Sequence, residues 1–219
     1  LPGETLDEII DDVVIFGSIR GIDGEGGVLA QAGPCLIRQD DAGTMTAVGV
    51  MTFDSADLET LSAGASLQDV IQHEMLHVLG IGTLWDDRHL IGGSGYSGAS
   101  ALRECRALGG DVACGSGVPL ENTGGQGTAN AHWRETTFNT ELMTGFLDSG
   151  TNPFSRITIG GLEDIGFDVN YAAFDPYTVF NNAALRAGPV VRLPAGWERT
   201  TRPIGILEDG KIKPLSTDP

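Results

Sequence analysis

The chain has 219 residues, enough for one large domain or two lobes with a substantial core. Its 13 Lys and Arg against 30 Asp and Glu give a net charge of −17, which argues against nucleic acid and anionic membrane surfaces as partners. No apolar run approaches the length of a membrane span, and no signal peptide opens the sequence. We therefore expect an acidic, secreted or salt-adapted monomer.

Strands dominate the first part of the chain. Runs of β-branched and other apolar residues between turn residues predict strands over 12–19, 28–32, 35–38 and 47–53. Gly33 and Pro34 separate the second run from the third, which indicates two short strands there. Several strands followed by one helix make an α+β fold, and we assign residues 1–80 to an N-terminal lobe.

A helix is predicted over residues 66–79, after these strands. Ser66 is its expected N-cap, and Asp69 three residues later completes a pair that resembles a capping box. Apolar residues recur at helical spacing through the segment. Gly80 then ends the helix in the manner of a C′ residue.

The predicted helix carries the pattern His-Glu-x-x-His at residues 73–77. His73 and His77 lie one turn apart on one face, so both imidazoles can reach one ion, and a catalytic Zn²⁺ binds such nitrogens while keeping a position open for water. Glu74 is rotated by about 100° from His73 and is placed to take a proton from that water. A surface helix that matches by chance is the alternative; the caps, the apolar surroundings and a total of four histidines argue against it.

Glycines cluster after this helix. We treat residues 81–131 as a Gly-rich insertion on the surface rather than part of the core, with one helix over 99–108. Cys105 and Cys114 lie close together in the insertion and predict a disulfide, which suits an oxidising compartment. Cys35 is then expected to be a free thiol.

Residues 132–219 are assigned to a C-terminal lobe. Ser155 is the expected N-cap of a helix over 155–165, and prolines in the tail predict loops and edge strands. Trp85 and Trp133 are expected to lie in the core rather than to contact a substrate.

A catalytic zinc site needs a third protein ligand. The candidates are His89, Glu104, Glu121 and His132. His89 follows three charged residues in a polar loop, which indicates a solvated side chain. Glu104 lies at the distance after His77 that is typical of thermolysin-like zinc peptidases, but their motif helix is not closed by a glycine. The residue types alone leave the choice open.

The motif together with its closing glycine, His-Glu-x-x-His-x-x-Gly over 73–80, resembles that of the metzincin metallopeptidases. Most metzincins place the third histidine three residues after the glycine, where this chain has Thr83. The chain therefore resembles the leishmanolysin family, in which an insertion separates the glycine from the third histidine.

The resemblance covers roughly residues 12–175 and includes the runs 131–135 and 141–145. It implies that His132 is the third zinc ligand and that Met143 belongs to the Met-turn beneath the zinc-binding rings. It also implies a metzincin-like zinc peptidase with a small twisted sheet, an active-site helix and an irregular C-terminal lobe.

The function implied by the resemblance is that of a secreted zinc-dependent endopeptidase with one catalytic Zn²⁺ and a protein or peptide substrate. Glu74 would act as general base on the zinc-bound water. The strand over 47–53, with Val50, would form the upper rim of the cleft and bind an extended peptide by strand addition. Phe146 would line the pocket for the side chain that follows the cleaved bond.

Other interpretations stay open on sequence grounds. One is a non-catalytic zinc-containing surface-binding or adhesin module of the same fold, against which Glu74 argues because a structural zinc needs no carboxylate there. Another is a zinc hydrolase acting on non-peptide bonds. Acidic pairs such as Asp54 with Asp57 are Ca²⁺ candidates, although none has the spacing of a known calcium loop. The family's long first helix is expected to lie upstream of residue 1, in which case this chain is a processed or truncated form. The family's cysteine-bearing pro-segment is not found in this sequence.

Overall fold

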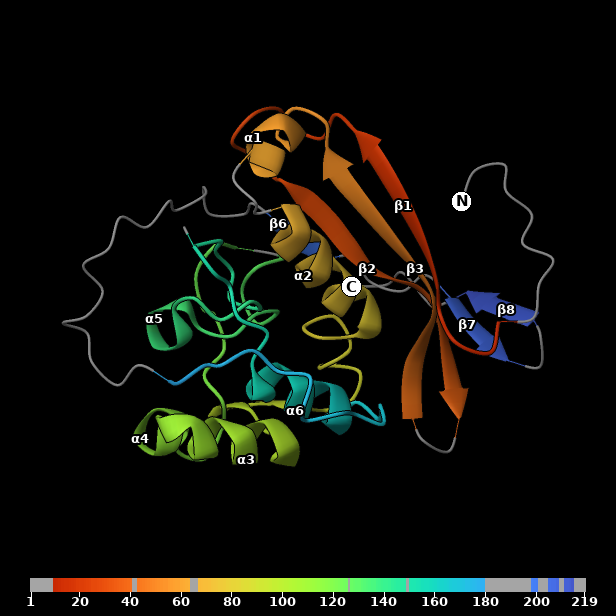
Figure 1. Cartoon of the computed structure of the whole chain (residues 1–219). Coiled ribbons are helices and arrows are strands. Elements are labelled where there is room, and N and C mark those ends of the chain that lie inside the picture. Colours follow the sequence, from red (N-terminus) through yellow and green to blue (C-terminus); the bar gives the residue numbers. More distant parts are fainter. Residues whose placement is uncertain are drawn as a thin grey trace.

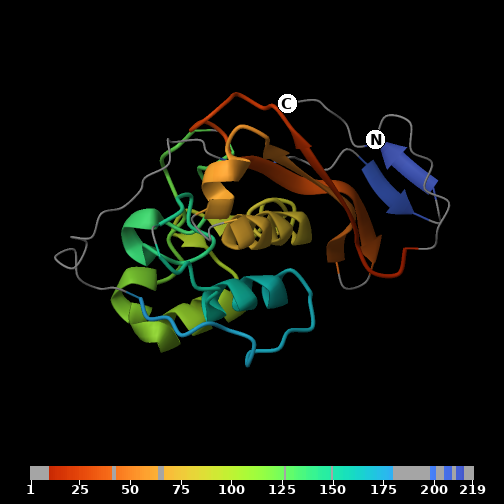
Figure 2. The same cartoon turned by 45° about the horizontal axis from the view of Figure 1, so that its top comes forward.

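The structure is a computed structural model that describes residues 10–40, 43–63, 67–125, 127–148, 150–179, 198–200, 205–208 and 211–214. These residues form a twisted sheet and a helical, turn-rich part, with one helix between them (Figure 1). A second view shows the same order of sheet, helix α2 (Leu67–Leu79) and the helices that follow α2 in the chain (Figure 2). The expected mixture of helices with a small sheet is confirmed.

The sheet is organised around its longest strand, β3. Its strands are β1 (Val14–Arg20), β2 (Ala30–Asp40), β3 (Gly43–Asp54), β6 (Glu198–Thr200), β7 (Gly205–Glu208) and β8 (Lys211–Pro214). The main path runs β1-β3-β2-β7-β8, and β6 also pairs with β2. β3 is parallel to β1 and antiparallel to β2. β3 therefore lies inside the sheet, which explains why most of its residues are buried.

β2 takes the place of two predicted strands. Gly33 and Pro34 continue the pairing with β3, and the register shifts between Pro34 and Leu36. Proline has no N–H to donate to a ladder, and an irregularity of this kind accommodates it. The prediction of separate strands over 28–32 and 35–38 is therefore wrong, because the Gly-Pro pair marks a bulge within one strand rather than a turn.

α2 ends as the sequence predicted. Gly80 has φ +117°, and the N–H of Ile81 donates to the carbonyl oxygen of Leu76 at 3.0 Å. The predicted N-cap, Ser66, lies outside the described residues. A short helix, α1 (Leu58–Ala63), precedes α2.

α2 separates two hydrophobic cores. On the side of the sheet, Val70 and Val78 are buried in a cluster with residues of β2 and β3. Thr46 in β3 donates its hydroxyl hydrogen to the carbonyl oxygen of Val78 at 2.6 Å and so ties the helix to the sheet. On the other side, Leu76 joins the second cluster. The helix is therefore held between two cores, which limits the directions its side chains can take.

The Gly-rich insertion builds much of the second core. Its elements are β4 (Ile91–Gly92), β5 (Gly95–Tyr96), α3 (Ala99–Cys105), the π-helical turn η1 (Arg106–Gly110) and α4 (Asp111–Cys114). Trp85, Tyr96 and Val118 are fully buried in the cluster that also contains Trp133. The prediction of a surface insertion is therefore wrong, because glycine-rich turns separate apolar residues that meet only in three dimensions. Both tryptophans lie in the core, as predicted.

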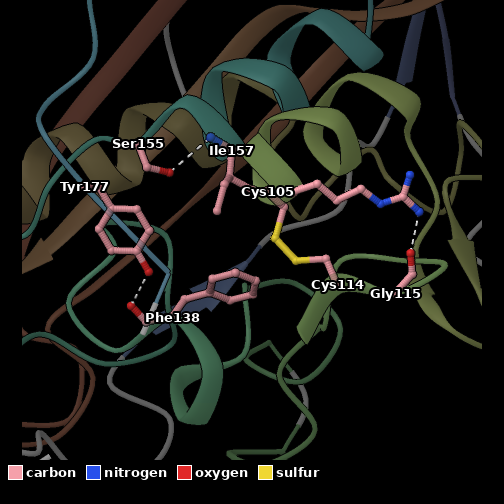
Figure 3. The surroundings of a disulfide bond; sticks show 8 residues. Cys105, Cys114, Gly115, Phe138, Ser155, Ile157 and Tyr177 are labelled. Atoms are coloured by element: carbon pink, nitrogen blue, oxygen red, sulfur yellow. Dashed lines mark hydrogen bonds between the residues drawn. A yellow bond between two sulfur atoms is a disulfide. The ribbon is translucent and has the colours of Figure 1, made fainter. Parts of the chain in front are cut away.

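The disulfide between Cys105 and Cys114 joins the end of α3 to α4 (Figure 3). Both half-cystines are buried beside Phe138, whose carbonyl oxygen accepts a hydrogen bond from the Tyr177 hydroxyl at 2.6 Å. Cys35 is a free thiol. The cysteine assignments made from the sequence are confirmed.

The C-terminal part contains α5 (Glu135–Phe138) and α6 (Arg156–Asp164). Ser155 is the predicted N-cap of α6, and its hydroxyl accepts from the N–H of Ile157 at 3.1 Å. In the tail, the described segments are the strands β6, β7 and β8, so strands are found there as predicted. The prediction of edge strands is wrong for β7, which lies between β2 and β8. Within the described part of the chain, none of the helices is long and apolar enough to cross a membrane.

Candidate metal centre

Three histidines converge at one point beside α2. The Nε2 atoms of His73 and His77 are 3.0 Å apart, and the Nε2 atom of His132 lies 3.3 Å from the first and 3.1 Å from the second. All three side chains are buried. They form the one group of potential metal ligands found among the described residues. The helix spacing therefore brings two imidazoles together as predicted, and the fold adds the third.

The outer ring nitrogens determine how the three rings are protonated. Each Nδ1 faces a main-chain carbonyl oxygen: that of Leu142 at 2.6 Å for His73, that of Ile81 at 2.7 Å for His77, and that of Thr128 at 2.9 Å for His132. A carbonyl oxygen can only accept, so in the neutral form of each ring Nδ1 carries the hydrogen and Nε2 presents a lone pair. The close Nε2 contacts are therefore three converging lone pairs rather than hydrogen bonds between neutral rings.

This arrangement fits a single Zn²⁺. Zinc binds histidine nitrogen at about 2.1 Å, so two nitrogens at tetrahedral positions lie about 3.4 Å apart. The observed separations of 3.0 to 3.3 Å are close to that value. Neutral imidazoles with the proton on the outer nitrogen are also the form in which histidine binds zinc. The residues present therefore match the metal that the sequence motif predicts.

The exit from α2 is closed by the residue that stands where most metzincins have their third histidine. Thr83 donates its hydroxyl hydrogen to the carbonyl oxygen of His77 at 2.6 Å. The same carbonyl oxygen accepts from the N–H of Gly80 at 3.2 Å, so Thr83 adds a second donor at the C-terminal end of the helix. The departure from the compact motif therefore has a structural role here, and His132 supplies the third nitrogen instead.

His132 is placed by three extended segments that run side by side. The N–H of Glu121 donates to the carbonyl oxygen of His132, and the N–H of Trp133 donates to that of Met143, both at 2.9 Å. Trp133 forms isolated bridges to both neighbouring segments. Met143 is completely buried. The segment of Met143 is thus adjacent to the segment of His132, whereas a Met-turn with its thioether beneath the rings stays a prediction.

Glu74 is completely buried on α2. It is four residues from both Val70 and Val78, so the three side chains share the face of the helix that is turned towards the sheet. His73 lies on the neighbouring face. The carboxylate is therefore buried on the side of α2 that faces the sheet, away from bulk solvent, and its place beside the metal centre stays a prediction.

The other candidates for a third ligand are elsewhere or already paired. His89 is exposed in the turns after α2. Glu104 accepts hydrogen bonds from Arg156 at 2.6 Å and from Arg103 at 2.9 Å; burial raises the pKa of Glu104, but these two bonds outweigh it and lower the pKa below its usual value. Glu121 is buried and accepts hydrogen bonds from donors of its own loop. None of the three belongs to the histidine cluster.

The acidic pair considered for Ca²⁺ has a different role. Asp54 accepts three hydrogen bonds from the N–H groups of residues 22–24, at 2.9 to 3.1 Å, and one from Ala56 at 2.8 Å. The N–H of Gly26 donates to Asp57 at 2.8 Å. The bond from Ala56 and those from the 22–24 segment lower the pKa of Asp54 to about 2. These carboxylates hold a loop through N–H donors, and a calcium site is not supported.

The two residues predicted to line the substrate cleft lie in β3 and in the segment after Met143. Val50 in β3 pairs with Phe16 of β1 on one side and with Gly33 of β2 on the other. Both edges of the strand over 47–53 are occupied by neighbouring strands. The prediction that a peptide adds as a strand at this position is therefore wrong. Phe146 is half-buried just after the Met-turn. Contact of Val50 or Phe146 side chains with a substrate stays a prediction.

Glu141 is a residue that the sequence analysis did not single out. Its side chain is completely buried and accepts hydrogen bonds from the N–H of Met143 at 2.6 Å and from the hydroxyl group of Ser155 at 2.7 Å. A carboxylate two residues before the predicted Met-turn methionine was the available signal. This signal does not reveal the hydrogen bond, because the partner Ser155 lies fourteen residues further along the chain.

Comparison with known proteins agrees with the site. Residues 108–183, which include His132 and Met143, match the family model described as Leishmanolysin. A leishmanolysin-like peptidase of Drosophila melanogaster is 41% identical over 63 residues, which cover 28% of this chain and 9% of that protein. A leishmanolysin-like peptidase of Caenorhabditis briggsae is 44% identical over 57 residues, covering 25% and 8%.

A longer match extends over both halves of the site. A leishmanolysin homolog of Crithidia fasciculata is 28% identical over 176 residues, which cover 74% of this chain and 25% of that protein. The chain thus spans a quarter or less of the length of these relatives. The matches confirm the resemblance predicted from the histidine motif, and the chain is similar to leishmanolysin-like peptidases over the matched regions.

Proposed function

We propose that this chain is the catalytic part of a zinc-dependent endopeptidase of the metzincin type. His73, His77 and His132 would hold one Zn²⁺ through their Nε2 atoms. The observation that carries the proposal is the convergence of three imidazoles whose Nε2 atoms lie 3.0 to 3.3 Å apart. The similarity to leishmanolysin-like peptidases supports the same conclusion.

The chemistry needs a general base beside the metal. When bound, Zn²⁺ acts as a Lewis acid that lowers the pKa of a water ligand to about 7. Glu74 would accept the proton of the attacking water and pass it to the leaving amine as the peptide C–N bond breaks. Its burial keeps bulk water away and would strengthen its electrostatic effect. The three carbonyl oxygens at the Nδ1 atoms would keep the rings in place during this step.

The substrate would be a protein or peptide, and the side chains of Val50 and Phe146 would contact it. We also propose a secreted monomer, in line with the disulfide between Cys105 and Cys114. The general base distinguishes this function from that of a non-catalytic zinc module. A module that only binds would have no use for Glu74.

The test measures zinc content and casein cleavage of the purified chain, with and without o-phenanthroline. The proposal expects about one zinc per chain and cleavage that the chelator abolishes. Glu74→Gln should keep the zinc and lose at least roughly a hundredfold in rate, as expected on losing a general base. A wild-type chain that binds zinc but cleaves no peptide bond would favour the adhesin-like alternative. Cleavage at the wild-type rate by Glu74→Gln would refute the assigned mechanism.

A further inference from the structure

The carboxylate of Glu141 is the hub of a buried hydrogen-bond network next to the metal centre. One oxygen, Oε2, accepts from the N–H of Met143 at 2.6 Å. The other, Oε1, accepts from the hydroxyl groups of Ser155 at 2.7 Å and Thr158 at 2.6 Å, and from the N–H of Ser155 at 3.3 Å. The side chain is completely buried, so none of these bonds competes with solvent.

The directions of these hydrogen bonds follow from the partners of each hydroxyl group. The Ser155 hydroxyl accepts from the N–H of Ile157 at 3.1 Å (Figure 3), so its own hydrogen is available to Glu141. The Thr158 hydroxyl accepts from the indole N–H of Trp133 at 2.8 Å, so its hydrogen also points to Glu141. Every group around the carboxylate is a donor. Burial raises the pKa of Glu141, and these donors oppose that effect because they favour the carboxylate form, which can only accept.

This network reaches two of the three histidines. The turn that Glu141 holds through Met143 contains Leu142, whose carbonyl oxygen accepts from Nδ1 of His73 at 2.6 Å. The Thr158 branch holds Trp133, the residue directly after His132. By contrast, the partners of His77 and His132 come from carbonyl groups four residues away in their own segments. Among these three Nδ1 contacts, only that of His73 is made with a residue far away in the sequence.

We propose that Glu141 is a positioning residue of the metal centre. It holds the 141–143 turn so that the Leu142 carbonyl keeps the proton of His73 on Nδ1 and turns its Nε2 towards the other two histidines. The inference rests on the proposed function for the identity of the ion. The orientation of the His73 ring can be tested in this chain whether or not a metal ion is bound.

The variant that tests this role is Glu141→Gln, which keeps the shape of the side chain. An amide must present its NH₂ group either to the N–H of Met143 or to the hydroxyl hydrogens of Ser155 and Thr158. Either choice sets donor against donor, so the turn loses one of its anchors. Glu104→Gln is the matched control, because Glu104 is a buried carboxylate with strong partners but without a link to the histidines.

Two measurements are made on wild type, Glu141→Gln and Glu104→Gln. Long-range ¹H–¹⁵N spectra of the metal-free protein report which ring nitrogen of each histidine carries the hydrogen. We expect Glu141→Gln to lose the single Nδ1–H form at His73 while His77 keeps it. Competition with a chelating dye should show zinc affinity weakened by about tenfold or more, as for other outer residues of metal sites. Glu104→Gln should match wild type in both measurements.

Retention of the Nδ1–H form at His73 in Glu141→Gln would overturn the proposal, and so would zinc affinity equal to that of Glu104→Gln. If Glu141→Gln does not fold, Thr158→Val decides by the same two criteria, because it removes one donor to Glu141 and the link to Trp133. A wild-type chain that binds no zinc would defeat the proposed function. The measured protonation of His73 would then be the single test of whether Glu141 is a positioning residue.

Discussion

The main chain of Gly82 lies directly against the carbonyl oxygen of Ala131. A Cβ added at Gly82 would be 2.0 Å from that oxygen, and φ at Gly82 is +76°. Gly82 belongs to the turn after α2, and Ala131 directly precedes His132. A residue without a side chain therefore lets the end of the motif helix and the segment of the third histidine approach each other.

Gly82→Ala should damage the metal centre, and the chain offers a matched control. Gly125 has the same φ of +76° but open space where a Cβ would lie. Gly125→Ala should cost about 1–2 kcal/mol, the cost of the left-handed conformation alone. Gly82→Ala adds the clash with Ala131, so it should be less stable than the control. It should also bind zinc about tenfold or more weakly, as expected for changes around a metal site.

Urea unfolding and a dye competition for zinc measure both effects. Equal stability and equal zinc affinity of Gly82→Ala and Gly125→Ala would show that the contact with Ala131 does not position the site.

Removing one histidine should separate the third ligand from the other candidates. His132→Ala is expected to lose zinc during dialysis against a mild chelator, whereas His89→Ala and Glu104→Ala should retain it. The reason is that losing one of three ligands weakens binding by orders of magnitude, while His89 is exposed and Glu104 is paired with arginines. Zinc content by atomic absorption is the measurement. Retention by His132→Ala together with loss by either other variant would assign the site to another class of zinc peptidase.

Asp54 should make folding sensitive to acid. The hydrogen bonds from Ala56 and the 22–24 segment hold the pKa of Asp54 at about 2, against 3.8 as the usual value. A lowered folded-state pKa stabilises the fold fully above the unfolded-state value, and this contribution disappears as the pH falls through about 2. Asp54→Asn should therefore be less stable than wild type near neutral pH, with the difference shrinking between about pH 4 and pH 2.

Urea midpoints across this range test the prediction, and the exposed Asp168→Asn serves as the control. A difference between wild type and Asp54→Asn that does not change with pH would contradict it.

The disulfide should contribute strongly to stability because it closes a loop within the buried core. Replacing both Cys105 and Cys114 by alanine should cost about 3 kcal/mol, the value expected for a closed loop of this size. Cys35→Ser, at a half-buried free thiol, should cost less. Thermal unfolding with and without reductant measures the effect, and the double variant should not respond to reductant. Non-reducing peptide mapping that joins Cys35 to either partner would contradict the assignment.

The sequence by itself determined the features that depend on neighbours along the chain. His73 and His77 share a helix face because they are four residues apart, and Gly80 ends that helix through its own conformation. Ser155 caps α6 by a bond to a residue two positions away. The resemblance to leishmanolysin-like peptidases then pointed to His132. Each of these inferences needs only helix geometry, local hydrogen bonding or a known motif.

Only the tertiary structure decided how the site is held. The Leu142 carbonyl that orients His73 is 69 residues away along the chain. The hydrogen bonds of Glu141 likewise join segments that are separate in the sequence. The same holds for β3, which lies between two strands, and for Trp85, which is buried within an apparently open Gly-rich segment. Strand pairing, burial and long-range hydrogen bonds depend on which distant residues meet. No pattern read along one chain specifies those partners, because the fold as a whole sets the distances between them.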